Sequence, residues 1–275
     1  MSSLSAGKPS RLKNCVAACT IGDEVLGGKT QDGNSHYLSK QLFRHGVPLH
    51  HIQVVPDEEE EIIQSVQYLS NTYGHVFTSG GIGPTHDDIT YSSIAKAFHL
   101  DLKPHQETLD RMKAIGFSPL SSSPRPPPTP EMIKSRERMA LLPHPAKVTY
   151  PCPQYWIPLV TVNDNVHILP GIPSLYAQLV DAALPSLLAS LSSSPLIRLS
   201  IGTNHPESEI SQILAQVQQE LDQQDHEDRR IRIGSYPRWP MTSSPRVVVT
   251  LVGKDKGLLD HWRKWISSKI DGFDV

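Results

Sequence analysis

Two adjacent carboxylates follow a cluster of glycines near residue 80, and together they could hold a phosphate group and a metal ion. The segment 78–90 reads TSGGIGPTHDDIT. Glycine tolerates positive φ and has no Cβ, so backbone N–H groups can approach a ligand, and amides at a helix start attract anions. Asp87 and Asp88 stand where a divalent cation could bridge protein and phosphate oxygens. The pattern predicts Gly80, Gly81, Gly83 and Thr85 as phosphate contacts.

A simpler interpretation exists for some of these residues. Asp88 is a good N-cap for the helix expected over 89–98, because Asp side chains readily accept the free N–H groups of a first turn. Capping alone does not explain three glycines, a proline and a second Asp within nine residues. His86 could act as a general base, although a structural role is the simpler explanation.

The elements around this segment alternate between strand and helix. Apolar runs at 14–21, 49–55 and 76–78 indicate buried strands, and helical patterns separate them. The second of these helices is expected to begin at Asp57, in capping-box register with Glu60, and to end at Gly74. Such alternation is typical of a doubly wound, mostly parallel sheet of the α/β class. The acidic run at 57–61 is interpreted as a solvated helix start rather than a metal site.

In a sheet of this kind, ligands bind beyond the carboxyl ends of the strands. The loops at 22–34 and 79–88 both leave such ends, so we expect them to face one crevice. Glu24 would then lie near Asp87 and Asp88 as a third candidate metal ligand. Asp32 and Asn34 are either ligand contacts or caps of the following helix, and the spacing leaves both open.

The middle of the chain supplies a second loop of this type. A hairpin is expected over 157–162 and 166–169, and its second strand runs into Pro170-Gly171-Ile172-Pro173 at the start of a helix. Pro170 and Gly171 are therefore predicted to line the same crevice. Helices are also expected over 104–115 and 131–141. Between them, residues 118–130 form a Pro/Ser-rich surface loop.

A serine-rich stretch at 190–195 marks the expected domain boundary. Residues 1–190 would form the larger α/β domain. Residues 191–275 show strand, helix, strand, strand and helix patterns, which predict a smaller α+β domain. Trp262 and Trp265 near its end are expected to pack in its core or between the domains.

Composition narrows the function classes. The chain has 275 residues, 38% hydrophobic and 20% charged, with a net charge of −2, so nucleic acid is not an expected partner. Three cysteines leave an odd thiol, which suits a reducing compartment. No apolar run approaches the ~20 residues of a membrane span. We therefore expect a cytoplasmic protein without a membrane anchor.

The chain resembles the molybdopterin-binding (MogA/MoaB-like) superfamily, and within it the branch of the N-terminal part of CinA and the N-terminal domain of eukaryotic FAD synthase. The segment at 79–90 is specific for this family, and the other segments support it as a series. The resemblance implies a three-layer, MogA-like sheet. The matching segments are GDEVLGG at 22–28, DGN at 32–34, SGGIGPTHDDIT at 79–90, RMALLP at 138–143, ILPGIP at 168–173 and IGSYP at 233–237.

The resemblance also implies a function. In family relatives the corresponding domain is associated with metal-dependent hydrolysis of a pyrophosphate bond in FAD or ADP-ribose, and relatives form homo-oligomers. The nucleotide-transferring domain of FAD synthase and the amidase domain of CinA are not matched, so their reactions are not expected. We therefore expect a pyrophosphatase that uses Mg²⁺ or a similar ion and acts on a small nucleotide. The alternative is a protein that binds molybdopterin or a flavin nucleotide without turnover.

Overall fold

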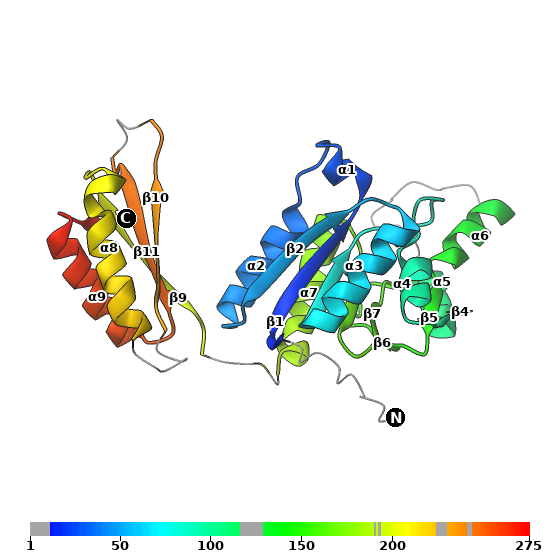
Figure 1. Cartoon of the computed structure of the whole chain (residues 1–275). Helices are drawn as coiled ribbons and strands as arrows, with labels where there is room; N and C mark the ends of the chain where they lie inside the picture. Colours follow the sequence, from blue (N-terminus) through cyan, green and yellow to red (C-terminus); the bar gives the residue numbers. More distant parts are fainter. Residues whose placement is uncertain (1–11, 116–128, 190, 192–193, 224–229, 241–243) are drawn as a thin grey trace, which may run out of the picture. The chain divides into compact units, whose positions relative to one another are not determined.

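The structure, a computed structural model, describes residues 12–115, 129–189, 191, 194–223, 230–240 and 244–275. The chain forms two compact units, which divide in sequence at about residues 192–193 (Figure 1). The Pro/Ser-rich loop predicted at 118–130 lies outside the described residues except for its last two positions. None of the described helices is long and apolar enough to cross a membrane.

The first unit is built on a six-stranded sheet with the order β2-β1-β3-β8-β7-β6. Four neighbouring strands, β2, β1, β3 and β8, are parallel, and β7 pairs antiparallel with both β8 and β6. The predicted mostly parallel α/β sheet is therefore confirmed. The strands are β1 (Leu12–Ile21), β2 (Leu49–Val55), β3 (Tyr73–Ser79), β6 (Lys147–Thr149), β7 (Leu159–Val162) and β8 (Val166–Leu169).

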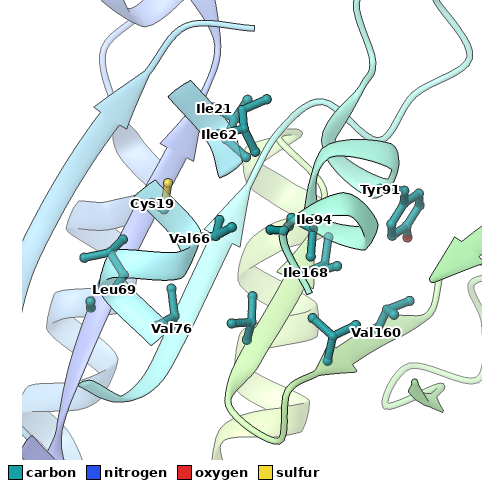
Figure 2. Close-up of a cluster of buried hydrophobic side chains, with 14 of the residues drawn as sticks. Cys19, Ile21, Ile62, Val66, Leu69, Val76, Tyr91, Ile94, Val160 and Ile168 are labelled. Atoms are coloured by element: carbon teal, nitrogen blue, oxygen red, sulfur yellow. The ribbon is translucent and has the colours of Figure 1, made fainter. Parts of the chain in front are cut away.

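Helices cover both faces of this sheet and make three layers. On one face, α3 (Glu59–Thr72) and α4 (Thr90–Ala97) pack against the sheet through a cluster of buried side chains, part of which Figure 2 shows. On the other face, α2 (Gly33–Arg44) and α7 (Pro173–Leu187) bury a second cluster. Because both faces are covered, the central strands are mostly buried and do not alternate between apolar and exposed polar residues.

A smaller group of elements lies between α4 and β6 in the chain. It comprises α5 (Gln106–Ile115), α6 (Pro130–Arg138) and an antiparallel pair, β4 (Asp101–Pro104) with β5 (Leu141–His144). Thr129 caps α6 by accepting the N–H of Met132, as the sequence predicts. The β4–β5 pair is not anticipated by the sequence. Residues 101–103 and 142–144 lie outside the elements that the sequence predicts, and only Pro104 and Leu141 fall at the ends of expected helices.

Two predicted boundaries are wrong. The helix expected to start at Asp57 has Glu58 at its N-cap position, without a side-chain cap, because the Asp57 carboxylate instead accepts the N–H of Asp23 at 3.0 Å. Gly74 does not end this helix. It lies inside β3, because the chain passes directly from α3 into the strand. The loop over 22–34 also contains a short helix, α1 (Asp23–Leu26).

The second unit is a small α+β domain, as predicted. Its sheet is antiparallel with the order β10-β11-β9-β12, and two helices share one buried core with it. Trp262 is buried in this core and Trp265 packs against it. The elements are β9 (Ile197–Thr203), α8 (Glu207–Asp222), β10 (Arg232–Pro237), β11 (Val247–Gly253), α9 (Lys256–Lys269) and β12 (Phe273–Asp274).

Candidate functional site

A cavity of about 500 Å³ lies at the carboxyl ends of β1, β3 and β8, three adjacent parallel strands. Its volume is within the range of small-molecule sites, about 300–1,000 Å³. The loops that follow these three strands supply most of its lining, so the loops expected to face one crevice do so. The predicted site residues that line it are Glu24, Asp32, Asn34, Gly80, Gly81, Gly83, Asp88, Pro170 and Gly171.

The glycine loop packs too closely against its surroundings to carry side chains. Gly80 has φ +110°, and a Cβ there would lie 2.1 Å from the carbonyl oxygen of Ile21. Gly81 has φ +63°, and a Cβ would lie 2.2 Å from the Thr90 hydroxyl. That hydroxyl donates to the Gly80 carbonyl at 2.9 Å, which fixes the loop against the start of α4. Glycine is therefore required at both positions by conformation and by space.

The amides of this loop are available to a ligand. Within the part of the chain that the structure describes, the N–H groups of Gly81, Ile82 and Gly83 have no hydrogen-bond acceptor. All three residues line the cavity. Consecutive unpaired amides form a concave donor set that suits an anion such as phosphate. The glycine loop is thus equipped to bind phosphate through its backbone.

Asn34 and Asp32 have structural partners. The buried Asn34 amide donates to the Ser79 hydroxyl at 2.7 Å and to the Gly171 carbonyl at 2.8 Å, so it joins α2 to the loops after β3 and β8. Asp32 caps α2 by accepting the N–H of Ser35 at 3.0 Å. Both residues still line the cavity. These hydrogen bonds give both residues a structural role, because they hold the segments around the cavity in place.

Asp88 closes the loop that carries the acidic pair. One oxygen of its carboxylate accepts the Thr85 N–H at 2.9 Å and also the Thr85 hydroxyl. The Arg138 guanidinium donates to the Asp88 carbonyl at 3.1 Å. Asp88 is therefore not the cap of α4, whose N-cap position is Ile89. Both Thr85 donors are used within the loop, so a phosphate would have to displace Asp88 to reach them.

Asp87 and His86 lie outside the cavity lining. The side chains of Asp87 and His86 are 60% and 98% exposed, with 4.0 Å between carboxylate and imidazole. The pKa of the Asp87 carboxyl is lowered, first by the nearby Thr85 hydroxyl, then by its own backbone N–H and by the charges of His86 and Arg138. Asp87 is thus a stable anion at the edge of the glycine loop.

Asp57 is the acidic residue of this site that the sequence did not assign. It follows β2 and lies near the glycine loop, where a Cβ on Gly81 would be 3.5 Å from its carboxylate. Burial raises its pKa, and so do the negative charges of Asp23, Glu24 and Asp87. This crowding shows that acids from three loops share one region. The only sequence signal was its position directly after a parallel strand.

Among the described residues, no three His, Cys, Asp or Glu side chains lie close enough together to enclose a metal ion on their own. Asp87, Asp88 and Glu24, the predicted metal ligands, therefore do not form a closed ligand set. An ion held here would need oxygens from the ligand or water to complete its shell, which is how Mg²⁺ is commonly bound.

Part of the cavity lining is apolar and was not predicted. It includes Tyr91 from α4, Met139 from the end of α6, and Trp156 and Ile157 from the segment before β7. An aromatic and aliphatic lining in the same cavity as the glycine loop suits a ligand with a planar ring at one end. A tryptophan in a Pro-rich segment was the only sign of this lining in the sequence.

The fold and the cavity define an α/β protein with a glycine loop that lines a cavity at the carboxyl edge of a mostly parallel sheet. Residues 17–189 match the family model described as "Probable molybdopterin binding domain", and the chain belongs to this family. Residues 195–273 match the model described as "FAD synthase, middle domain". The predicted family is therefore confirmed.

Similar proteins agree with this assignment. "Probable FAD synthase" of Caenorhabditis elegans is 31% identical over 236 residues, 82% of this chain and 44% of that protein. "CinA-like protein" of Myxococcus xanthus is 32% identical over 208 residues, 70% of this chain and 45% of that protein. The solved structure of the protein CinA from Thermoplasma acidophilum is 28% identical with a TM-score of 0.53, covering 63% of this chain and 98% of that one. The chain spans less than half the length of these curated relatives.

Proposed function

We propose that this chain hydrolyses the pyrophosphate bond of a nucleotide, FAD or an ADP-ribose-like compound, in the presence of a divalent cation such as Mg²⁺. The observation that carries the proposal is the meeting of two opposite chemistries at the glycine loop, which lines the cavity and has the Asp57 carboxylate beside it. The unpaired amides of Gly81–Gly83 favour phosphate oxygens, whereas the carboxylates around Asp57 favour a cation. A pyrophosphate with its bound cation carries phosphate oxygens for the amides and a positive charge for the carboxylates. The relatives named as FAD synthases support a flavin or adenine nucleotide as the substrate class.

The carboxylates fit a cation because they repel one another without one. The raised pKa of Asp57 reflects burial and three neighbouring negative charges. A cation beside Asp57 and Asp87, with Glu24 or Asp88 nearby, would relieve that repulsion. When bound, it would supply charge neutralisation and Lewis acidity at the pyrophosphate.

The protein itself would bind and orient the nucleotide. The loop amides would hold one phosphoryl group and stabilise the charge that develops on it, since such transfers depend mainly on positioning and electrostatics. The apolar lining with Trp156 would hold the ring of the nucleotide and keep water from that end. His86 is proposed as a general base, since a side chain that is 98% exposed does not favour a structural role in the loop.

The direct test is hydrolysis of FAD to FMN and AMP, and of ADP-ribose to AMP and ribose 5-phosphate, followed by chromatography with Mg²⁺ or Mn²⁺ and with chelator. We expect Asp57→Asn to lower kcat about 100-fold or more, as loss of a main electrostatic contact does. Asp87→Ala and Asp88→Ala should also lower it. Asp110→Asn, an exposed acid on α5, is the matched control and should leave turnover unchanged. Full activity in Asp57→Asn and Asp87→Ala would refute the assignment.

The alternative is a protein that binds molybdopterin or a flavin nucleotide without turnover. The incomplete ligand set and the internal pairing of Asp88 with Thr85 favour it. Mass spectrometry of ligand released from the purified protein separates the two. An adenylylated pterin or intact flavin nucleotide that copurifies, with no hydrolysis under any metal, would support the binding role.

A further inference from the structure

A second cavity, of about 340 Å³, lies beside the β4–β5 pair and shares no lining residue with the first. The buried part of its lining is apolar and includes Leu142, with Ala146 and Val148 half-buried. Lys103 and His144 are exposed on its lining, and His105 is half-buried there. None of its lining residues is a carboxylate.

Two of the three basic residues lie on the antiparallel β4–β5 pair, and the third follows β4 directly. Lys103 lies on β4 opposite Leu142, His144 is the last residue of β5, and His105 joins β4 to α5. The backbone hydrogen bonds between β4 and β5 therefore fix the positions of Lys103 and His144. The helix α5 begins at Gln106, so its positive dipole end adjoins the same group.

The His105 ring has its orientation and tautomer fixed. Its Nδ1 accepts the Thr108 N–H at 3.3 Å and lies 2.9 Å from the Thr108 hydroxyl, so Nδ1 acts as an acceptor. The hydrogen of the neutral ring is then on Nε2, which becomes a donor. In the part of the chain that the structure describes, Nε2 has no hydrogen-bond partner. His105 thus keeps one donor for a ligand.

The other two groups are also free to donate. Lys103 faces Asp101 at 3.5 Å, but both side chains are exposed, and exposed pairs of this kind contribute little. Within the described chain, the His144 side chain has no hydrogen-bond or ion-pair partner. Lys offers donors only, and both histidines can donate. The lining therefore favours an anion over a cation.

We propose that this cavity binds the phosphate group of a small molecule, with Lys103, His105 and His144 as donors. A phosphate group carries three strong acceptor oxygens, which match three donors from separate positions. The apolar floor of the cavity, formed by Leu142, Ala146 and Val148, would contact the carbon part of the ligand. The site is separate from the pyrophosphatase proposed above, and neither depends on the other.

The test uses NMR of the full chain, with the ring C–H signals of the histidines assigned from His→Gln variants. Inorganic phosphate is added at constant pH and ionic strength, against chloride and acetate. We expect the signals of His105 and His144 to shift saturably with phosphate, while His205 of the second unit stays unchanged. Phenyl phosphate should bind several-fold more tightly than phosphate because its ring can cover the apolar floor.

Lys103→Gln and His144→Gln should each weaken phosphate binding about tenfold, whereas Lys113→Gln, an exposed lysine on α5, should not. All three side chains are exposed, so these variants are expected to fold. The proposal is overturned if neither phosphate nor phenyl phosphate shifts His105 and His144, or if chloride or acetate shifts them equally. Because the readout is local to these rings, it is unaffected if FAD hydrolysis fails.

Discussion

Gly80→Ala should destabilise the first unit far more than Gly28→Ala, although both glycines have positive φ. Gly28 has φ +72° and nothing within 4 Å of an added Cβ. Its replacement therefore costs only the strain of a left-handed alanine, about 1–2 kcal/mol. Gly80 has φ +110° and would place Cβ 2.1 Å from the Ile21 carbonyl oxygen, in the adjacent strand. Moving packed backbone adds about 1–3 kcal/mol, giving roughly 2–5 kcal/mol in total.

Hydrogen exchange read by mass spectrometry can measure this difference in the intact chain. Peptides from β1 and β3 report opening of the first unit alone, so the second unit does not interfere. Since 1.4 kcal/mol is a factor of ten, Gly28→Ala should speed their exchange about tenfold and Gly80→Ala on the order of 100-fold or more. Equal acceleration in the two variants would show that the close contact with Ile21 does not restrain the loop, and the reasoning would fail.

Three further predictions concern the same unit. Asn34→Ala removes the donor to the buried Ser79 hydroxyl and to the part-buried Gly171 carbonyl, and it should lower the free energy of unfolding by about 1–3 kcal/mol in thermal melts. Exposed Asn71→Ala should not, and equal melts for the two variants would refute the bridging role. Burial, then the charges of His75 and Lys147, lowers the pKa of His167 to about 3. The unfolded state therefore takes up a proton first, near pH 6.5, and stability falls as the pH drops below that value, by about 2 kcal/mol at pH 5. Urea midpoints at pH 7.5 and 5 check this slope, which His167→Gln should flatten. Arg138→Ala frees the loop at 85–88 and should speed its amide exchange several-fold without changing exchange in β1; unchanged loop exchange would contradict this.

Many local features of this fold can be predicted from the sequence alone. The run at 16–21 is short and mostly apolar because both faces of a central parallel strand are buried, and this composition is readable without coordinates. Gly80 and Gly81 were recognisable because no other residue fits a tight turn with positive φ. Thr129 before Pro130 predicted a helix start, because capping is a local interaction.

Tertiary structure decided which side chains meet. Asp57 has the pattern of a helix cap, yet its carboxylate accepts the N–H of Asp23, 34 positions away, and the charges of Glu24 and Asp87 act on it. Trp156 joins the cavity only because the antiparallel strands return the chain to the same sheet edge. Such contacts depend on strand order and on competition among partners distant in sequence, which local patterns do not encode. The residue types were therefore visible in the sequence, while their grouping into a site required the fold.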